Sequence, residues 1–171
     1  MNLGPRRVRP RFPEEWHVPE DPKLWISWRH ASGKLSKEEV YWVSSSSRDG
    51  RPHAAPVWGI WKRNRLYFET DPGSVKGRNL LANPRLVAHI QDGMDTVIIE
   101  GTAARLTRKA DLRLLLGDFV KKYDYKPDWS AKSGQVVFEV MPETVHAWRA
   151  PRMHRTLVNF VFRQGHGGAT T

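Results

Sequence analysis

The stretch DPGSVKGRNLLANPR, residues 71–85, gathers groups that bind anions around one predicted helix end. Asp71-Pro72-Gly73 is typical of a turn, and Ser74 can act as the N-cap of a helix that begins at Val75. The first amides of a helix have no intrahelical acceptor and carry partial positive charge, so they suit a phosphate. Asn83-Pro84 then ends the helix.

The side chains of this predicted helix add further polar groups. Lys76 and Asn79 are three residues apart and so share one face, whereas Arg78 is two residues from Lys76 and points elsewhere. A hydroxyl, free amides, an ammonium and an amide side chain are therefore combined in one segment. This set predicts a phosphate cradle. Spacing alone leaves open an ordinary capped connector between two strands, because capped helices with an early lysine are common.

Other polar residues are better explained as parts of the structure. The three histidines on predicted strands, His53, His89 and His146, do not have the spacing of metal ligands, so we expect no metal site. Asp92 and Asp95 bracket a predicted turn and are expected to be solvated. No catalytic acid or base stands out among the remaining residues.

The composition fits one globular domain. With 171 residues, 39% of them hydrophobic and 8 of them Trp, the chain can bury one core but hardly two. The chain has no run of about 18 apolar residues, so no membrane span is predicted. The N-terminal arginines are not followed by the apolar segment of a secretory signal. Cys is absent, which excludes disulfides and thiolate chemistry and fits a reducing compartment. We therefore expect a cytoplasmic protein.

The formal net charge of +10 is concentrated at the two ends of the chain. Residues 1–11 and 149–171 each hold four arginines and no acid, which leaves only +2 for the rest. This distribution predicts a basic N-terminal arm with a short helix over 1–35, a folded domain over 36–150 and a basic C-terminal tail over 151–171. The simplest explanation of this charge is that the termini are exposed to solvent. The alternative is that the basic termini attract anionic ligands over long range. A nucleic-acid partner is not favoured, because such domains concentrate charge on their folded face.

The pattern along the chain predicts strands interrupted by few helices. Asp21 can cap one short helix and Ser36 another, with Glu39 at the capping-box position. Alternation and turn residues predict strands at 41–47, 52–62, 66–70, 84–91, 96–107 and 134–148, and helices at 75–82 and 108–125. Gly101 marks a bulge, and Pro142 breaks or bends the last strand. Short connections and strands with two apolar faces predict a mainly β (α+β) fold, a six-stranded antiparallel barrel.

Three blocks of sequence resemble one known superfamily. DGRPHAAPVWGIW (49–61), LYFETDPGSVKGRNLLANPR (66–85) and VIIEGTAARLT (97–107) are similar, in this order and spacing, to the pyridoxamine-5′-phosphate-oxidase-like split-barrel flavin and deazaflavin reductases. The match spans about Tyr41 to Trp148, most of the chain. The resemblance implies an FMN-binding-like split β-barrel that forms a homodimer with two cofactor sites at the subunit interface.

The resemblance also implies which residues hold the cofactor. The positions that match the strand along its ring system are Pro56, Val57 and Trp58. The positions that match its phosphate site are Thr70, Ser74 and Lys76, with Asn79 at a polar position on the same helix. Thr96 matches a position that reaches the cofactor from its own chain or from the partner chain.

One departure from the family pattern bears on the choice of cofactor. The FMN oxidases that make pyridoxal phosphate commonly carry Arg-Lys after the serine, whereas this chain has Val75-Lys76, and Arg78 could compensate only from another helical face. VKGRNL and PVWGIW look more like the branch that uses the 8-hydroxy-5-deazaflavin coenzyme (F-420), which carries a lactyl phosphate and an anionic oligoglutamate tail.

The resemblance therefore implies hydride transfer between this coenzyme and an unidentified small-molecule substrate. Three other functions stay open. The first is an FMN-dependent oxidase or reductase like pyridoxamine-phosphate oxidase. The second is a non-catalytic flavin- or haem-binding protein. The third is a DNA-associated protein that uses its basic tails.

Overall fold

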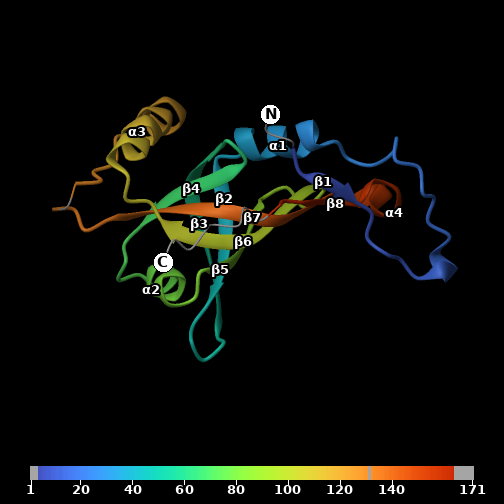
Figure 1. Cartoon of the computed structure of the whole chain (residues 1–171), viewed down its shortest axis with the longest axis horizontal. Coiled ribbons are helices and arrows are strands. Elements are labelled where there is room, and N and C mark those ends of the chain that lie inside the picture. Colours follow the sequence, from blue (N-terminus) through green and yellow to red (C-terminus); the bar gives the residue numbers. More distant parts are fainter. Residues whose placement is uncertain (1–3, 131, 164–171) are drawn as a thin grey trace, which may run out of the picture.

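The protein folds into an antiparallel sheet of eight strands that curls on itself and carries helices on its outside (Figure 1). The structure, a computed structural model, describes residues 4–130 and 132–163. The strands are β1 (Arg6–Val8), β2 (Val40–Ser46), β3 (Pro52–Lys62), β4 (Arg65–Thr70), β5 (Arg85–Ile90), β6 (Asp95–Arg105), β7 (Val136–Arg149) and β8 (Val158–Val161). The helices are α1 (Trp28–Lys37), α2 (Val75–Ala82), α3 (Lys109–Tyr123) and α4 (Met153–Thr156), with 3₁₀ turns at Glu14–Trp16 and Ala150–Arg152.

Six of these strands close into a barrel. They lie in the order β7-β4-β3-β2-β5-β6, and β6 pairs back with β7, so the ring has no free edge. The long strand β7 pairs with β4 through its first residues and with β8 through its last ones. The predicted mainly β fold with a six-stranded antiparallel split barrel is confirmed, and β8 and β1 extend it.

The pairing of β6 with β7 is irregular at one point, where Glu143 of β7 is left without a partner on β6. The register between β6 and β7 shifts between Glu100 and Gly101, where the sequence predicted a bulge. A side chain at position 101 would lie under 3.0 Å from the backbone of Met141, so only glycine fits there. Pro142 lies opposite Gly101, and β7 continues through it without a break. A proline is tolerated at this irregular position.

The barrel core is closed at one side by α1. Ala31 and Leu35, four residues apart on this helix, are fully buried, and the side chain of Trp28 packs against Phe160. The helix starts earlier than the sequence predicted, because Ser27 rather than Ser36 caps it by accepting from the amide of His30.

The two helix starts predicted before the first strand are therefore wrong. Ser36 lies inside α1, where its hydroxyl donates back to the carbonyl of Ser32 at 2.9 Å. Asp21 accepts from the amide of Lys23 at 2.9 Å and closes a turn instead of starting a helix. A capping residue alone does not decide where a helix begins when the buried stripe lies further along the chain.

Helix α3 covers the outer face of β3, β4 and β7, apart from the main core (Figure 1). Leu115 and Phe119 of this helix are buried against Ile60, Tyr67 and Val137. No helix of the described residues is long and apolar enough to cross a membrane.

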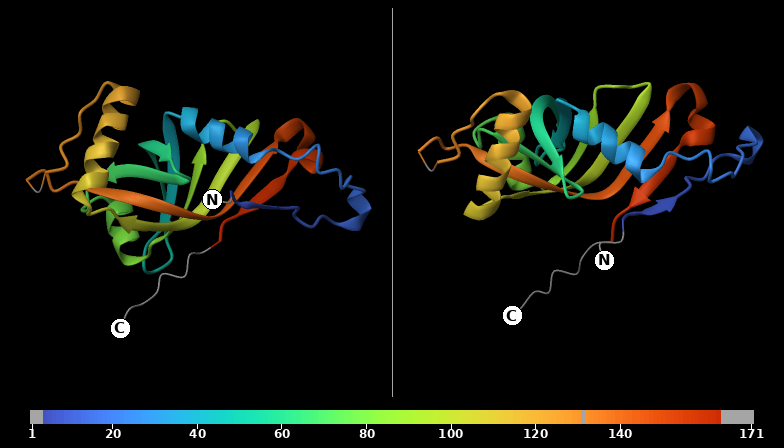
Figure 2. Two further views of the ribbon diagram at one scale, coloured as in Figure 1. Left: turned by 45° about the horizontal axis from the view of Figure 1, so that its top comes forward. Right: turned by 90° about the horizontal axis from the view of Figure 1, so that it is seen from above.

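Parts of both basic ends are folded into the sheet. Arg6–Val8 pairs with β8, and Val158 and Phe160 of β8 are fully buried in the core. The Arg9 guanidinium donates to the carbonyls of His154 and Leu157 at the end of α4. Figure 2 shows β1 lying along β8 at the end of the molecule away from α3.

Candidate functional site

The predicted phosphate cradle lies where β4 ends and α2 begins. The ammonium of Lys76 donates to Thr70 Oγ1 at 2.8 Å, and Thr70 Oγ1 lies 3.1 Å from Ser74 Oγ. Ser74 Oγ donates to the carbonyl of Asp71 at 2.7 Å and accepts from the amide of Gly77 at 3.0 Å. The Thr70 hydroxyl therefore donates to Ser74, since the Ser74 proton is already engaged. Ser74 is the N-cap of α2, as predicted.

Lys76 supplies the cation of this predicted cradle. Its side chain is half-buried, and burial lowers the pKa of the ammonium. Among residues 4–130 and 132–163, no carboxylate lies within ion-pair distance of it, so only the Thr70 hydroxyl meets its charge. A desolvated cation beside two hydroxyls and a helix N-terminus is suited to bind a phosphate.

Gly77 sets the position of the helix N-terminus. A side chain there would approach the Asp71 carbonyl oxygen and the Pro72 backbone to within 3.0 Å. The first turn of α2 therefore packs directly on the turn that precedes it. This contact fixes the first turn of α2, where the amides of Val75 and Lys76 have no intrahelical acceptor.

The other two polar residues of α2 serve different contacts. Asn79 is buried, with 6% of its surface exposed, and its amide nitrogen donates to Ser45 Oγ of β2 at 3.2 Å. It ties α2 to the barrel. Arg78 is exposed, and its guanidinium folds back to donate to the carbonyl of Gly73 at the turn before the helix. Arg78 therefore lies at the rim of the cradle, although it starts from another helical face.

The predicted ring-binding strand runs beside the cradle. β3 and β4 pair from Gly59 and Phe68 onward, which places Pro56, Val57 and Trp58 beside the Thr70 end of β4. Val57 is buried in the barrel, whereas Pro56 and Trp58 face outward.

Trp58 is held in place from α3 although 49% of it is exposed. Its indole stacks on the ring of Tyr123 with centroids 4.9 Å apart and an angle of 7° between the planes. The Tyr123 hydroxyl accepts from the amide of Gly59 at 2.9 Å and lies 2.7 Å from its carbonyl, and Lys122 donates to the same carbonyl at 2.9 Å. The end of α3 thus orients a flat apolar side chain on the outer face of β3.

Thr96 does not join this group within one chain. Thr70 pairs with Val136 at the start of β7, whereas Thr96 pairs with Trp148 near its end. These two positions on β7 are 12 residues apart, or roughly 40 Å of extended strand. The buried Thr96 hydroxyl donates to the carbonyl of Gly93 at 2.9 Å. The structure thus gathers Thr70, Ser74, Lys76, Arg78 and Asn79 around the start of α2, places Pro56, Val57 and Trp58 on the neighbouring strand, and leaves Thr96 at the other end of β7.

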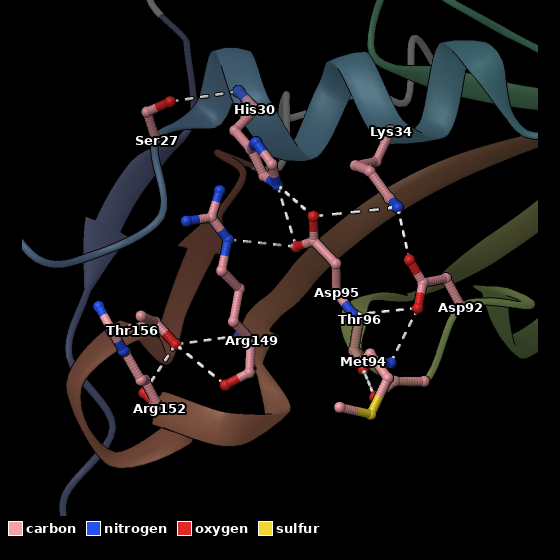
Figure 3. Close-up of polar contacts among 11 residues, drawn as sticks. Ser27, His30, Lys34, Asp92, Met94, Asp95, Thr96, Arg149, Arg152 and Thr156 are labelled. Carbon is pink, nitrogen blue, oxygen red and sulfur yellow. Dashed lines mark hydrogen bonds and ion pairs between the residues drawn. The ribbon is translucent and has the colours of Figure 1, made fainter.

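A polar network beside Thr96 was missed by the sequence analysis. In Figure 3, side chains from α1, the β5–β6 turn and the end of β7 converge on Asp95. His30 Nε2 lies 2.8 Å from Asp95 Oδ2, while the ammonium of Lys34 and the Nε of Arg149 each lie 3.9 Å from its carboxylate. Lys34 also donates to Asp92 at 2.7 Å.

The expectation of solvation holds for Asp92, whose side chain is 41% exposed, and is wrong for Asp95. The side chain of Asp95 is only 23% exposed, because α1 lies over the turn and supplies His30. The ammonium of Lys34 and the amides of Met94 and Asp95 lower the pKa of Asp92 to about 2. The network joins the first residues of β6, including Thr96, to α1.

A basic cavity of about 500 Å³ lies next to this network. The charged side chains that line it are Lys23, Asp95, Arg149, Arg152 and Arg155. Thr156 Oγ1 accepts from the amide of Arg149 and donates to the carbonyl of Arg152, both at 2.9 Å, and so fixes this turn. An arginine at every third position was a visible signal in the sequence, but it fell in the segment assigned to a tail.

Two of the three strand histidines, His146 and His89, have structural partners. His146 Nδ1 lies 2.8 Å from Asn159 Oδ1, and His89 Nδ1 lies 2.8 Å from the carbonyl of Ile90. No group of three or more His, Asp or Glu side chains that could hold a metal ion occurs among the residues that the structure describes.

The chain is thus a split barrel in which a capped helix follows the third barrel strand, and the predicted anion cradle lies at the N-terminus of that helix. The profile of the family described as "Pyridoxamine 5'-phosphate oxidase" matches residues 29–149. The chain belongs to that family. No protein with a curated function matches the sequence significantly.

Solved structures with the same fold share little sequence with this chain. A conserved hypothetical protein from Mycobacterium tuberculosis has a TM-score of 0.65 and 17% identity, covering 90% of this chain and 99% of that chain. A FAD-binding protein from Mesorhizobium loti has a TM-score of 0.56 and 21% identity, covering 70% and 92%. A structure described as an F420 reductase has a TM-score of 0.55 and 19% identity, covering 67% and 94%.

Proposed function

We propose that the protein is a homodimeric oxidoreductase that transfers a hydride between an 8-hydroxy-5-deazaflavin coenzyme and a small organic substrate. The observation that carries this proposal is the half-buried Lys76 ammonium, which faces hydroxyls and a helix N-terminus and has no carboxylate within ion-pair distance in the described residues. Membership of the pyridoxamine-5′-phosphate oxidase family and the likeness to a structure described as an F420 reductase support it.

The residues of this chain would bind and orient the coenzyme, which supplies the redox chemistry when bound. Lys76 and the first amides of α2 would hold the phosphate, and the hydroxyls of Thr70 and Ser74 would turn toward it. Arg78 would close the rim. Asn79 keeps α2 against β2 through Ser45.

Pro56, Val57 and Trp58 would line the ring system and keep water from one of its faces. The stacking of Trp58 on Tyr123 makes this wall rigid before any ligand binds. Thr96 would come from the second copy of the chain, since its own cradle is at the far end of β7.

Two features favour the deazaflavin coenzyme over FMN. Val75 is an exposed apolar residue at the position where FMN oxidases of this family commonly carry an arginine, so the cradle has one cation fewer for a phosphate dianion. The cavity lined by Arg149, Arg152 and Arg155 offers further cations, which suit a coenzyme tail with several carboxylates. FMN is the second candidate, because the family match is to pyridoxamine 5′-phosphate oxidase.

A parallel titration of the full-length apo-protein tests the proposal. FMN and the oxidised and reduced deazaflavin coenzyme are added separately, and heat or fluorescence is recorded. Tight deazaflavin binding with weak FMN binding supports the proposal, and the reverse order of affinities replaces it with the FMN-dependent function. Tight binding without any oxidation of the reduced coenzyme by quinone substrates would indicate a carrier, either of flavin or, if haem also binds, of haem. Binding of neither cofactor would contradict a cofactor site.

A further inference from the structure

A second cavity, of about 310 Å³, lies outside the proposed cofactor site between α3 and the β3–β4 hairpin. This volume falls within the range of ligand pockets. The cavity adjoins the Arg65 end of β4, whereas Thr70 and the cradle are at its other end. Tyr67 contributes to it from the outer face of β4, under α3. In Figure 1, α3 and α2 lie on different sides of the barrel.

The floor and one wall of the cavity are apolar. Leu115 is buried, Leu106 packs against the same small core, and Leu114 stands at the edge with 58% of its surface exposed. An apolar group that covers Leu114 removes its exposed apolar surface from water, which favours binding. The ligand should therefore have an aliphatic or aromatic body.

The charges at the rim are nearly balanced. Each of the three carboxylates that line the cavity has its own cation: Lys62–Asp118 at 2.6 Å, Arg65–Glu139 at 3.1 Å and Arg108–Asp111 at 2.7 Å. The Tyr67 hydroxyl also donates to Glu139 at 3.0 Å. An organic cation would find no free carboxylate here.

Arg63 is the fourth cation and has no carboxylate of its own. It stands in the tight turn between β3 and β4, with φ of 53°, and within the described ranges no acidic side chain lies within ion-pair distance of it. Burial and the nearby Glu139 raise the pKa of the Tyr67 phenol to about 12. The positive charge of Arg63 lies close enough to the phenol to oppose part of this rise. The phenol stays protonated and the cavity keeps one net positive charge.

We propose that this cavity binds a small organic monoanion, a carboxylate with an aliphatic or aromatic body. The planar guanidinium of Arg63 pairs with the carboxylate, and Leu106, Leu114 and Leu115 contact the body. A dianion would carry more negative charge than the single positive charge that the cavity leaves unbalanced, so a monoanion fits better. The site is independent of the cofactor, so its test does not depend on the function proposed above.

Three probes of one shape and different charge test this inference on the full-length protein. 3-Phenylpropionate, its neutral amide and 3-phenylpropylamine are titrated by calorimetry, and the amide signals that shift are mapped by NMR. The carboxylate should bind about tenfold or more tightly than the amide, the amine should bind weakest, and shifts should gather at Leu106, Tyr67 and Leu114. Equal affinities for the three probes, or shifts confined to other surfaces, would overturn the proposal.

Variants assign the interaction to its residues. Arg63→Gln should lower the affinity for 3-phenylpropionate about tenfold and remove its advantage over the amide. Arg113→Gln is the matched control, since Arg113 is exposed on α3 but does not line the cavity. Leu114→Asn should weaken all three probes alike and carries the test if Arg63→Gln does not fold. An unchanged affinity in both folded variants would refute the assignment.

Discussion

At the scale of single residues, Lys76 decides whether the cradle binds an anion. Lys76→Ala should weaken coenzyme binding by about 1.5–3 kcal/mol, or roughly 10- to 150-fold, because a charge-assisted hydrogen bond to the phosphate is lost. Calorimetric titration measures the change. Lys121→Ala, which removes an exposed lysine from α3, is the control and should bind as the unaltered protein does. Equal affinities for both variants would remove Lys76 from the site.

The protonation of Lys76 gives this binding a defined pH dependence. Burial lowers the pKa of Lys76 in the free protein, and a bound anion raises the pKa again. Affinity should therefore be constant while the free ammonium is charged. It should then fall about tenfold per pH unit between the free and bound pKa values, starting at a lower pH than for an exposed lysine. Dissociation constants measured over alkaline pH test this, and the Lys76→Ala profile should not show the fall.

Gly77 tests the packing that places the helix N-terminus. Gly77→Ala should destabilise the protein by about 1–3 kcal/mol, because the new methyl group meets the Asp71 carbonyl and the Pro72 backbone. Urea unfolding measures this loss, and the cofactor titration shows whether the cradle moved. Gly117→Ala is the matched control inside α3, where no atom lies within 4 Å of the added carbon, and it should stabilise by about 0.5–1 kcal/mol. Equal effects of the two changes would contradict the packing argument.

Sequence reasoning worked well at this scale where the chemistry is local. Ser74 caps α2 through the amide of Gly77, three residues away, so its role could be predicted from spacing. The roles of Asp95 and Arg149 depend on α1 lying over the β5–β6 turn, and no local pattern contains that information. Proximity created by tertiary packing is therefore what the sequence analysis lacked.

At the scale of elements, the end of α3 fixes the aromatic wall on β3. Tyr123→Phe removes the hydroxyl that contacts the amide and carbonyl of Gly59, and leaves a buried amide without its partner. The protein should lose about 1–2 kcal/mol of unfolding free energy, and the exposed indole of Trp58 should become more mobile. Urea unfolding and Trp58 side-chain NMR signals measure both effects.

Tyr125→Phe is the control for this change. Its ring also contacts Trp58, but no hydrogen bond of its hydroxyl is found within the described residues. It should leave both stability and the Trp58 signals nearly unchanged. Similar losses in both variants would contradict a specific role of the contact between the Tyr123 hydroxyl and Gly59.

Elements with regular patterns were predicted more successfully than their neighbours. The six barrel strands are apolar segments bounded by turn residues, and Gly101 marks the irregular pairing of β6 with β7. Helix α1 was misplaced because Ser36 and Glu39 form a capping-box pattern, whereas burial of Ala31 and Leu35 decides where the helix lies. Strand β1 has three residues, and it forms only by pairing with β8, about 150 residues later in the chain. A strand this short has no detectable period.

At the scale of the whole molecule, one chain carries an incomplete version of the proposed site. The cradle lies at one end of β7, while Thr96 and the arginine-lined cavity lie at the other. Two copies related by a twofold axis can bring the cradle of one chain to Thr96 of the other, and symmetry then makes two equal sites. The homodimer is thus a functional requirement of the proposal, and it can be tested with mixed dimers.

Mixed dimers with Lys76→Ala on one chain and Thr96→Val on the other distinguish the two arrangements. If each site takes Lys76 from one chain and Thr96 from the partner, one site of the mixed dimer carries both changes and the other carries none. Titration of dimers purified through two different tags should then find one tight site per dimer, and both single-variant homodimers should have none. If both residues serve the same chain's site, every site in the mixed dimer carries one change, and no tight site should remain. A tagged pair of unaltered chains, with two tight sites, calibrates the stoichiometry.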